Sequence, residues 1–129
     1  MARRRARCDP LLVALRTLIV DDSPRFLQAA RGLLEGEGMA VVAVAATSDE
    51  ALRRADELQP DVTLVDICLG DEDGVDLAQR LSIAQQAPVI LISTYAQDEV
   101  AHLVSASDAI GFVSKSEMSV SAIQDVLGC

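Results

Sequence analysis

From Thr17 onward, short apolar runs alternate with stretches in which apolar residues recur every three or four positions. The runs predict buried strands, and the longer spacing predicts helices that pack one face against them. Predicted strands cover residues 18–20, 41–44, 62–65, 88–92 and 109–113, each followed by a predicted helix. Because strands that alternate with helices need crossover connections, this pattern predicts an α/β fold with one parallel sheet.

Local signals mark where several helices begin and end. Ser23-Pro24 predicts a helix start, with a capping hydroxyl and proline in the first turn, and Gly36 and Gly38 predict its end. Thr47 or Ser48 can cap the next helix. Aromatic residues make up only 2% of the chain, so its core must consist of Val, Ile, Leu and Ala. That composition suits strands buried on both faces.

Charge is unevenly distributed along the 129 residues, whose net charge is −9. Residues 1–16 contain five arginines and one aspartate, a net charge of +4, which leaves −13 for the rest. We expect residues 1–16 to form a disordered basic arm, with a start codon placed too early as the alternative, and residues 17–129 to form one domain. So acidic a domain argues against nucleic-acid binding by the folded part and is compatible with a cation site.

The cysteines and the apolar segments bear on location. The three cysteines show neither pairing nor zinc-ligand spacing, so a reducing cytoplasm is expected. No apolar stretch approaches the roughly 20 residues that span a bilayer, and the apolar segment near the start is too short for a signal peptide. We therefore predict a cytoplasmic protein without membrane contact.

Polar residues follow four of the five predicted strands. In a parallel sheet of this kind, functional groups gather where the carboxyl ends of the strands meet. The residues expected there are Asp21 and Asp22 after the first strand, Asp66 after the third, Ser93 and Thr94 after the fourth, and Lys115 after the fifth. The sequence thus predicts carboxylates, hydroxyls and an ammonium at one edge of the sheet.

These residue types indicate phosphoryl-transfer chemistry. Clustered carboxylates repel one another, and a hard divalent cation such as Mg²⁺ relieves this repulsion by binding their oxygen atoms. One carboxylate can attack phosphorus to give an aspartyl phosphate, while an ammonium and a hydroxyl hold the phosphoryl oxygens. Lys115 is the only lysine in the chain, and its place at a strand end favours a role in holding a phosphoryl oxygen. The acidic run 71–74 lacks the ligand spacing of a calcium loop and is interpreted as a solvated loop leading into a helix.

Residues 17–127 resemble the receiver domains of bacterial two-component response regulators. The resemblance is carried by Leu-Ile-Val-Asp21-Asp22-Ser, Leu-Val-Asp66-Ile, Gly74, Pro-Val-Ile-Leu-Ile-Ser93-Thr94 and Gly-Phe112-Val-Ser-Lys115. It implies a flavodoxin-like, doubly wound sheet of five parallel strands in the order 2-1-3-4-5, with helices on both faces. The last segment is similar to receivers coupled to helix-turn-helix output domains.

The resemblance also implies roles for individual residues. Asp66 would be the phosphoacceptor, and Mg²⁺ would be held by Asp22, Asp66 and the backbone carbonyl of Cys68, with Asp21 acting largely through water. Lys115 and Ser93 would contact the phosphoryl group, helped by the backbone N–H groups of Ile67 and Thr94. Phe112 would turn inward as Ser93 moves toward the phosphoryl group.

Departures from the family pattern carry expectations of their own. Gly70 stands where many receivers have proline, so we expect a looser loop after Asp66. Ser116 stands where many have a cis-proline, and we expect a trans bond. Phe112 lacks the hydroxyl of the commoner tyrosine.

Taken together, these features predict a phosphorylation-controlled binding module that turns over no separate substrate. A histidine kinase or phosphotransfer protein would phosphorylate Asp66, and a face formed by the fourth helix, fifth strand and fifth helix would bind a downstream protein or a second copy. We expect a stand-alone receiver, with a fragment of a DNA-binding regulator as the alternative. A metal-dependent phosphatase of the haloacid-dehalogenase kind is disfavoured, because its nucleophile would follow the first strand in an Asp-x-Asp pattern. The intact set of acidic, hydroxyl and lysine residues argues against a degenerate scaffold.

Overall fold

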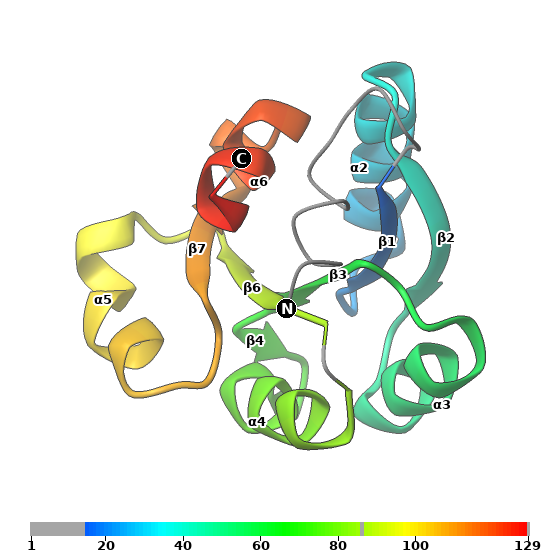
Figure 1. The fold of residues 1–129 in the computed structure, drawn as a ribbon. Coiled ribbons are helices and arrows are strands. Elements are labelled where there is room, and N and C mark those ends of the chain that lie inside the picture. The colour runs from blue at the N-terminus through cyan, green and yellow to red at the C-terminus, as the bar shows by residue number, and fades with distance from the viewer. Residues whose placement is uncertain (1–14, 86, 129) are drawn as a thin grey trace.

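A computed structural model describes residues 15–128 apart from residue 86 (Figure 1). Its main strands are β1 (Arg16–Val20), β2 (Ala40–Ala45), β3 (Val62–Asp66), β6 (Val89–Ser93) and β7 (Gly111–Ser114). Its α-helices are α2 (Pro24–Gly36), α3 (Ser48–Leu58), α4 (Gly74–Ala84), α5 (Gln97–Ser105) and α6 (Val120–Leu127). A short hairpin of β4 (Cys68–Leu69) and β5 (Glu72–Asp73) lies between β3 and α4, and a 3-10 turn, η1 (Lys115–Glu117), follows β7.

The main strands form one parallel sheet in the order β2-β1-β3-β6-β7. Because the β4–β5 hairpin pairs only with itself, this is the predicted order 2-1-3-4-5 of five main strands. The predicted fold class is confirmed. The order reverses direction between β1 and β3, which lie side by side, so the edge of the sheet beyond their carboxyl ends is where such folds bind ligands.

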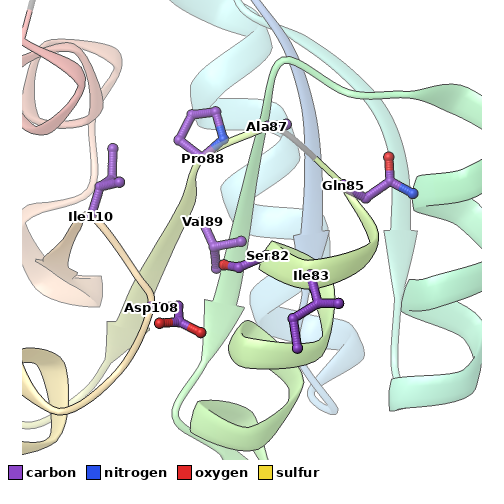
Figure 2. A pocket seen from close by; sticks show the side chains of 8 residues that line it. All are labelled: Ser82, Ile83, Gln85, Ala87, Pro88, Val89, Asp108 and Ile110. Atoms are coloured by element: carbon purple, nitrogen blue, oxygen red, sulfur yellow. The ribbon is translucent and has the colours of Figure 1, made fainter.

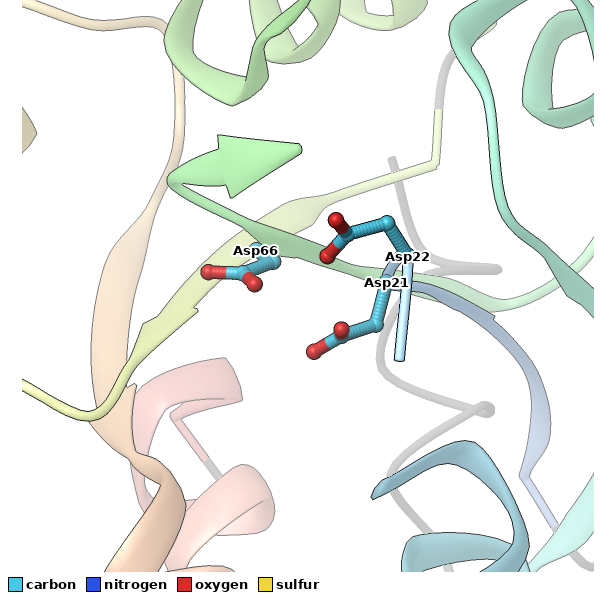
Figure 3. A group of neighbouring side chains, drawn as sticks. All are labelled: Asp21, Asp22 and Asp66. Carbon is cyan, nitrogen blue, oxygen red and sulfur yellow. The ribbon is translucent and has the colours of Figure 1, made fainter. Parts of the chain in front are cut away.

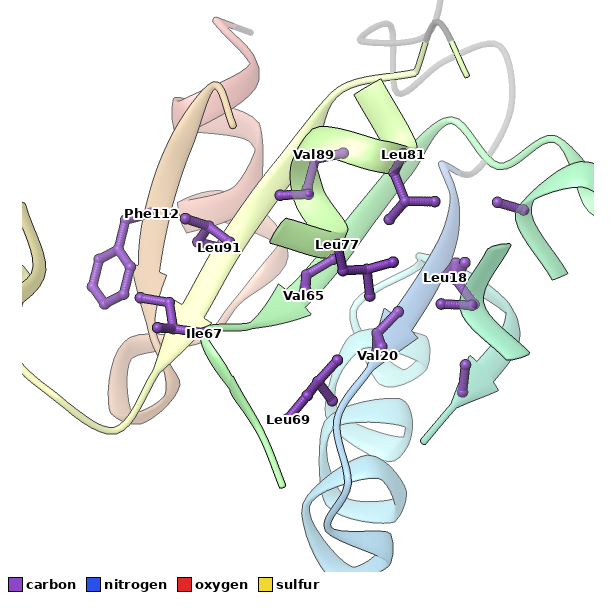
Figure 4. Packing of buried hydrophobic residues seen from close by; sticks show 14 of the residues in the cluster. Leu18, Val20, Val65, Ile67, Leu69, Leu77, Leu81, Val89, Leu91 and Phe112 are labelled. Atoms are coloured by element: carbon purple, nitrogen blue, oxygen red, sulfur yellow. The ribbon is translucent and has the colours of Figure 1, made fainter. Parts of the chain in front are cut away.

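Alternate residues of the strands point into two hydrophobic clusters on opposite faces of the sheet. On one face, Leu18 and Val65 pack with α3, α4 and α5. Figure 4 shows Leu77 and Leu81 of α4 lying over the strands on this face. On the other face, Ile19 and its neighbours pack with α2 and α6. Burial on both faces explains why the strands are apolar throughout, and it leaves the strand ends as the place for polar groups.

The predicted helix signals agree with the structure. Ser23 caps α2, its Oγ accepting a hydrogen bond from the Phe26 N–H at 3.2 Å, and proline opens the helix. Thr47, rather than Ser48, caps α3. No peptide bond of the described residues is cis, so the bond between Lys115 and Ser116 is trans, as expected.

The predicted boundary between the arm and the domain was wrong. Arg16, assigned to the arm, begins β1, and Leu15 is buried in the core, because the edge of the sheet gives both residues partners: the Leu15 carbonyl accepts from Ala40 N at 2.8 Å. Residues 1–14 lie outside the described residues, so the disordered arm stays a prediction. The last helix begins at Val120, since Ser119 caps it and η1 precedes it. Among residues 15–85 and 87–128, no helix is long and apolar enough to cross a membrane.

Candidate functional site

The structure brings the predicted site residues to one edge of the sheet. Asp21 directly follows β1, Asp66 is the last residue of β3, Ser93 is the last residue of β6, and Lys115 directly follows β7. These strands are neighbours, with β3 between β1 and β6, so their carboxyl ends adjoin. The convergence predicted from strand ends alone is therefore present in the fold.

Three carboxylates form the centre of the site (Figure 3). One ligand oxygen from each of Asp21, Asp22 and Asp66 lies within 4.8 Å of those of the other two. Asp21 is fully buried and Asp66 is 6% exposed, whereas Asp22 is exposed to solvent. The site thus has two buried carboxylates behind one that is open to water, which gives a cation an entry path.

Lys115 pairs with both buried carboxylates. Its Nζ lies 2.5 Å from Asp21 Oδ2 and 3.1 Å from Asp66 Oδ2, and its side chain is only 14% exposed. One ammonium therefore offsets part of the charge of two carboxylates. Burying carboxylates without such a partner is strongly unfavourable, so the pairing stabilises the acidic site in the folded chain.

This environment changes the acidity of both partners. Burial raises the pKa of Asp66; the Lys115 ammonium opposes this change, and the charge of Asp21 adds to it. Burial alone would lower the pKa of Lys115, but hydrogen bonds and charge from Asp21 and Asp66 outweigh burial, and the pKa is raised. Lys115 thus remains charged at neutral pH.

Backbone N–H groups orient the two buried carboxylates. Ser23 N donates to Asp21 Oδ1 at 2.9 Å, where the chain turns from β1 into α2. Cys68 N donates to Asp66 Oδ1 at 3.2 Å. These bonds fix Oδ1 of each carboxylate, while Oδ2 of each faces Lys115.

The Ile67 N–H, expected to support the phosphoryl group, has a backbone partner in this structure, so its role at a phosphoryl group stays a prediction. It donates to the carbonyl of Ile92 on the neighbouring strand at 3.0 Å, extending the pairing of β3 with β6. The N–H that reaches Asp66 belongs to Cys68, one residue later. The pleat of a strand decides this, because alternate N–H groups point to opposite neighbours.

The hydroxyl and the aromatic residue expected to respond to phosphorylation lie on adjacent strands. Ser93 is 2% exposed and its Oγ accepts a hydrogen bond from Tyr95 N at 3.0 Å. Thr94 and Tyr95 are exposed. Phe112 is 8% exposed and belongs to the cluster on the α4 face, with Leu91, so its ring occupies the inward position here (Figure 4).

Glycines shape the loop after Asp66. Gly70 adopts a φ of 58° at the tip of the β4–β5 hairpin, and a Cβ there would lie 3.1 Å from Asp22 Oδ2. A Cβ on Gly74 would lie 1.8 Å from the Asp66 carbonyl oxygen, far closer than a non-bonded carbon can approach an oxygen. The chain therefore returns directly behind Asp66, and only glycine allows it. The sequence pattern drew attention to Gly74 but contained no signal for this contact.

The acidic run after Asp66 is exposed and leads into α4, as expected, but part of it pairs in the short β4–β5 hairpin. Glu72 Oε1 accepts from Ser48 N at 2.8 Å and so ties the hairpin to the start of α3, and Asp73 caps α4 by accepting from Val75 N at 2.9 Å. The looser loop expected from Gly70 stays a prediction, since the structure describes an ordered hairpin at this position without measuring its motion.

The donor set fits a hard divalent cation. Mg²⁺ prefers oxygen ligands and keeps several waters, and here carboxylate oxygens from two strand ends lie close together with solvent on the side of Asp22. No sulfur or imidazole belongs to this group. The three carboxylates carry more negative charge than the one paired lysine can neutralise. Negative charge therefore remains for a cation to balance.

A second pocket lies away from the acidic site and is lined mainly by apolar residues. It is lined by residues near the end of α4, the start of β6 and the segment before β7, such as Ile83, Val89 and Ile110 (Figure 2). These lie at the amino ends of the strands, away from Asp66. Its one charged side chain, Asp108, has no partner among the lining residues with which to form a catalytic pair.

Comparison with known proteins agrees with this geometry. Residues 17–126 match the family model of the response regulator receiver domain. The transcriptional regulatory protein KdpE of Mycobacterium tuberculosis is 39% identical over 93 residues, which cover 70% of this chain and 41% of that protein. The chain spans about a quarter to a half of the length of the curated relatives that it matches first.

Solved structures give the same result. A two-component response regulator of the LuxR family from Aurantimonas sp. SI85-9A1 superposes with a TM-score of 0.79 at 28% identity, covering 89% of this chain and 86% of that chain. A response regulator from Burkholderia pseudomallei, solved with a phosphorylated aspartic acid, calcium ion and citrate, gives 0.75 at 28% identity and covers 88% of this chain and 66% of that one. The chain therefore belongs to the response regulator receiver domain family, the phosphorylation-activated signalling modules of two-component systems.

Proposed function

We propose that Asp66 is the phosphoacceptor of this receiver, with a histidine kinase or a histidine phosphotransfer protein as donor. The observation that supports this most is the contact of Lys115 with both buried carboxylates, since it sets one ammonium beside Asp66, a buried carboxylate that ends a central strand. A carboxylate oxygen of Asp66 attacks phosphorus, and the bond from phosphorus to the donor nitrogen breaks. Asp66 then carries an acyl phosphate.

Residues around Asp66 have distinct parts in this reaction. Lys115 moves from the Asp66 carboxylate to a phosphoryl oxygen, where its charge is retained because its pKa is raised. Asp21, Asp22, Asp66 and the Cys68 carbonyl would hold Mg²⁺, with Asp21 acting largely through water. When bound, Mg²⁺ neutralises charge on the phosphoryl oxygens.

The signal leaves the site through Ser93 and Phe112. Ser93 Oγ exchanges its bond from Tyr95 N for a phosphoryl oxygen, and the Thr94 N–H supports the same group. The ring of Phe112 is already buried in this structure, and phosphorylation then stabilises that position and the matching shape of the face formed by α5, β7 and α6. A ligand shifts such a two-state equilibrium only by the difference in its contacts with the two states. This face binds the downstream protein or a second copy of the chain, and the module works in the cytoplasm without turning over a separate substrate.

A test uses acetyl phosphate as the donor. The protein is incubated with acetyl phosphate and Mg²⁺, and its intact mass is measured beside that of Asp66→Asn. We expect one added phosphoryl group on the parent protein and none on the variant. A mass gain that survives in Asp66→Asn, or no gain on the parent, overturns the assignment.

A second candidate is that the chain is the receiver part of a DNA-binding regulator. The matches to KdpE and to a LuxR-family regulator favour it, because the matched segment is less than half of KdpE. Reading the genomic open reading frame beyond residue 129 decides between this and a stand-alone receiver.

A further inference from the structure

The aromatic ring of Phe26 lies against the Lys115 ammonium. Nζ of Lys115 is 4.3 Å from the centroid of the ring. Phe26 belongs to the first turn of α2, the helix that begins just after Asp21 and Asp22. No motif in the sequence marks Phe26, yet it contacts the only lysine of the chain.

The ring completes the surroundings of the ammonium. Asp21 and Asp66 approach Nζ on two sides, and the ring covers a further side, which leaves the lysine side chain 14% exposed. The face of an aromatic ring attracts a cation without offering a lone pair. The Phe26 ring therefore attracts the Lys115 ammonium, and the N–H groups of the ammonium remain free to donate to the surrounding oxygen atoms.

Phe26 is itself held in place. Its backbone N–H donates to Ser23 Oγ at 3.2 Å, so the cap of α2 fixes the start of the turn. Its half-buried side chain packs against the hydrophobic cluster between the sheet, α2 and α6. The ring is thus a fixed surface beside a side chain that has to move.

We propose that Phe26 is a positioning residue for Lys115. It keeps the ammonium at the acidic site, yet lets it pass from the Asp66 carboxylate to a phosphoryl oxygen, because the attraction of a ring face has little directionality. The effect on phosphorylation rests on the function proposed above for Asp66, whereas the contact itself does not.

The kinetic test is a double-mutant cycle on the full chain, with acetyl phosphate and Mg²⁺ as the probe. Phe26→Leu keeps an apolar side chain but removes the ring, and we expect phosphorylation to slow by about threefold to tenfold, the range of a typical cation–π contact. Phe26→Tyr should stay within about twofold of the parent, since it keeps the ring. Leu33→Ala, at an exposed apolar position of the same helix, is the matched control and should not change the rate.

The cycle separates positioning from a general effect on the fold. In a Lys115→Gln background, Phe26→Leu should change the rate by less than about twofold, because its effect acts through the ammonium. An equal slowing with and without Lys115, or an unchanged rate in Phe26→Leu, overturns the proposal.

A second measurement does not depend on phosphorylation. Because Lys115 is the only lysine, protein labelled with ¹³C at lysine Cε gives one side-chain signal. We expect its attached protons to be shifted upfield by the ring in the parent and in Phe26→Tyr, and to return toward the position of free lysine in Phe26→Leu. A parent signal at the free-lysine position contradicts the contact. An upfield signal in a protein that accepts no phosphoryl group would instead contradict the function of Asp66 alone.

Discussion

Lys115 shows how much of this site depends on one residue. It is the partner of two buried carboxylates, Asp21 and Asp66, and it packs under the ring of Phe26. Ten arginines elsewhere in the chain supply the other positive side-chain charges. An ammonium on a flexible stem can shift between oxygen atoms, whereas a guanidinium holds a fixed fork of donors. If Asp66 is phosphorylated as we propose, the side chain that pairs with the two buried carboxylates also binds the phosphoryl group.

Removing the charge of Lys115 should have an effect on stability that depends on pH. Its raised pKa means that its contribution is complete below the ordinary lysine pKa of about 10.4 and is lost as the pH rises through the raised value. Lys115→Met should lower the free energy of unfolding by about 3 kcal/mol at neutral pH. Urea denaturation at several pH values measures this. A difference between parent and variant that fails to shrink above about pH 10.4 contradicts the pairing.

Asp22 offers a way to remove cation binding without removing the fold. It is exposed, unlike its two neighbours, and contributes one of the clustered oxygens. We expect Mg²⁺ to raise the melting temperature of the parent, since a ligand bound only by the folded state stabilises it. Asp22→Asn should lose at least about tenfold in Mg²⁺ affinity and melt no lower than the parent without Mg²⁺, because it relieves repulsion. Circular dichroism melts with and without Mg²⁺ measure both effects, and a variant that keeps the full Mg²⁺ shift sinks the prediction.

We predict that Tyr95 affects how long the phosphoryl group lasts on Asp66. It is 53% exposed, two residues after Ser93, and its backbone N–H bonds to Ser93 Oγ. We predict that its ring shields the acyl phosphate from water, so Tyr95→Ala should lose the phosphoryl group faster than the parent. The decay of the phosphorylated mass after donor removal measures this. Equal decay rates would mean that the ring does not cover the path of water.

At the level of elements, the β4–β5 hairpin and the start of α4 form a compact support behind Asp66. The hairpin pairs Cys68 with Asp73 and Leu69 with Glu72, and the Gly74 N–H donates to the Ile67 carbonyl at 2.9 Å. The chain thus turns back at Gly70 and touches the backbone of Asp66 again. This closed loop holds the Cys68 N–H at the edge of the site, where it donates to Asp66.

Two glycines give matched tests of this arrangement. Gly74→Ala would place a Cβ 1.8 Å from the Asp66 carbonyl oxygen, so we expect it to destabilise the fold by about 3 kcal/mol or more and to slow phosphorylation. Gly32 lies inside α2 with nothing within 4 Å of a Cβ, so Gly32→Ala should stabilise the fold by about 1 kcal/mol. Chemical denaturation of both variants checks the pair. A tolerated alanine at residue 74 would mean that the loop does not close as described.

The elements could be predicted from the sequence, and the hairpin could not. Burial on both faces of the sheet requires apolar strands, and helices packed on it require apolar residues at helical spacing. Both patterns can be seen directly in the sequence. The pairing of β4 with β5 involves only two residues on each strand, too short for any period to appear. The roles of Glu72 and of the Cys68 N–H depend on how distant segments meet, and no local pattern marks such contacts.

At the scale of the whole molecule, strand order explains why the site is where it is. Asp21, Asp66, Ser93 and Lys115 are spread over 95 positions of the chain, yet the order β1-β3-β6-β7 places their strands next to one another. That order followed from the resemblance to a known family. The polar residues at the predicted strand ends identified the residues of the site. The contact between Phe26 and Lys115 became visible only in the folded structure.

The most direct test of this account asks which residue carries the phosphoryl group. Protein phosphorylated with acetyl phosphate and Mg²⁺ is reduced with borohydride, which converts an aspartyl phosphate to homoserine, and is then digested and sequenced by mass spectrometry. We expect homoserine at residue 66 alone. Homoserine at residue 21 or 22, or a phosphoryl group that borohydride leaves in place, would contradict it.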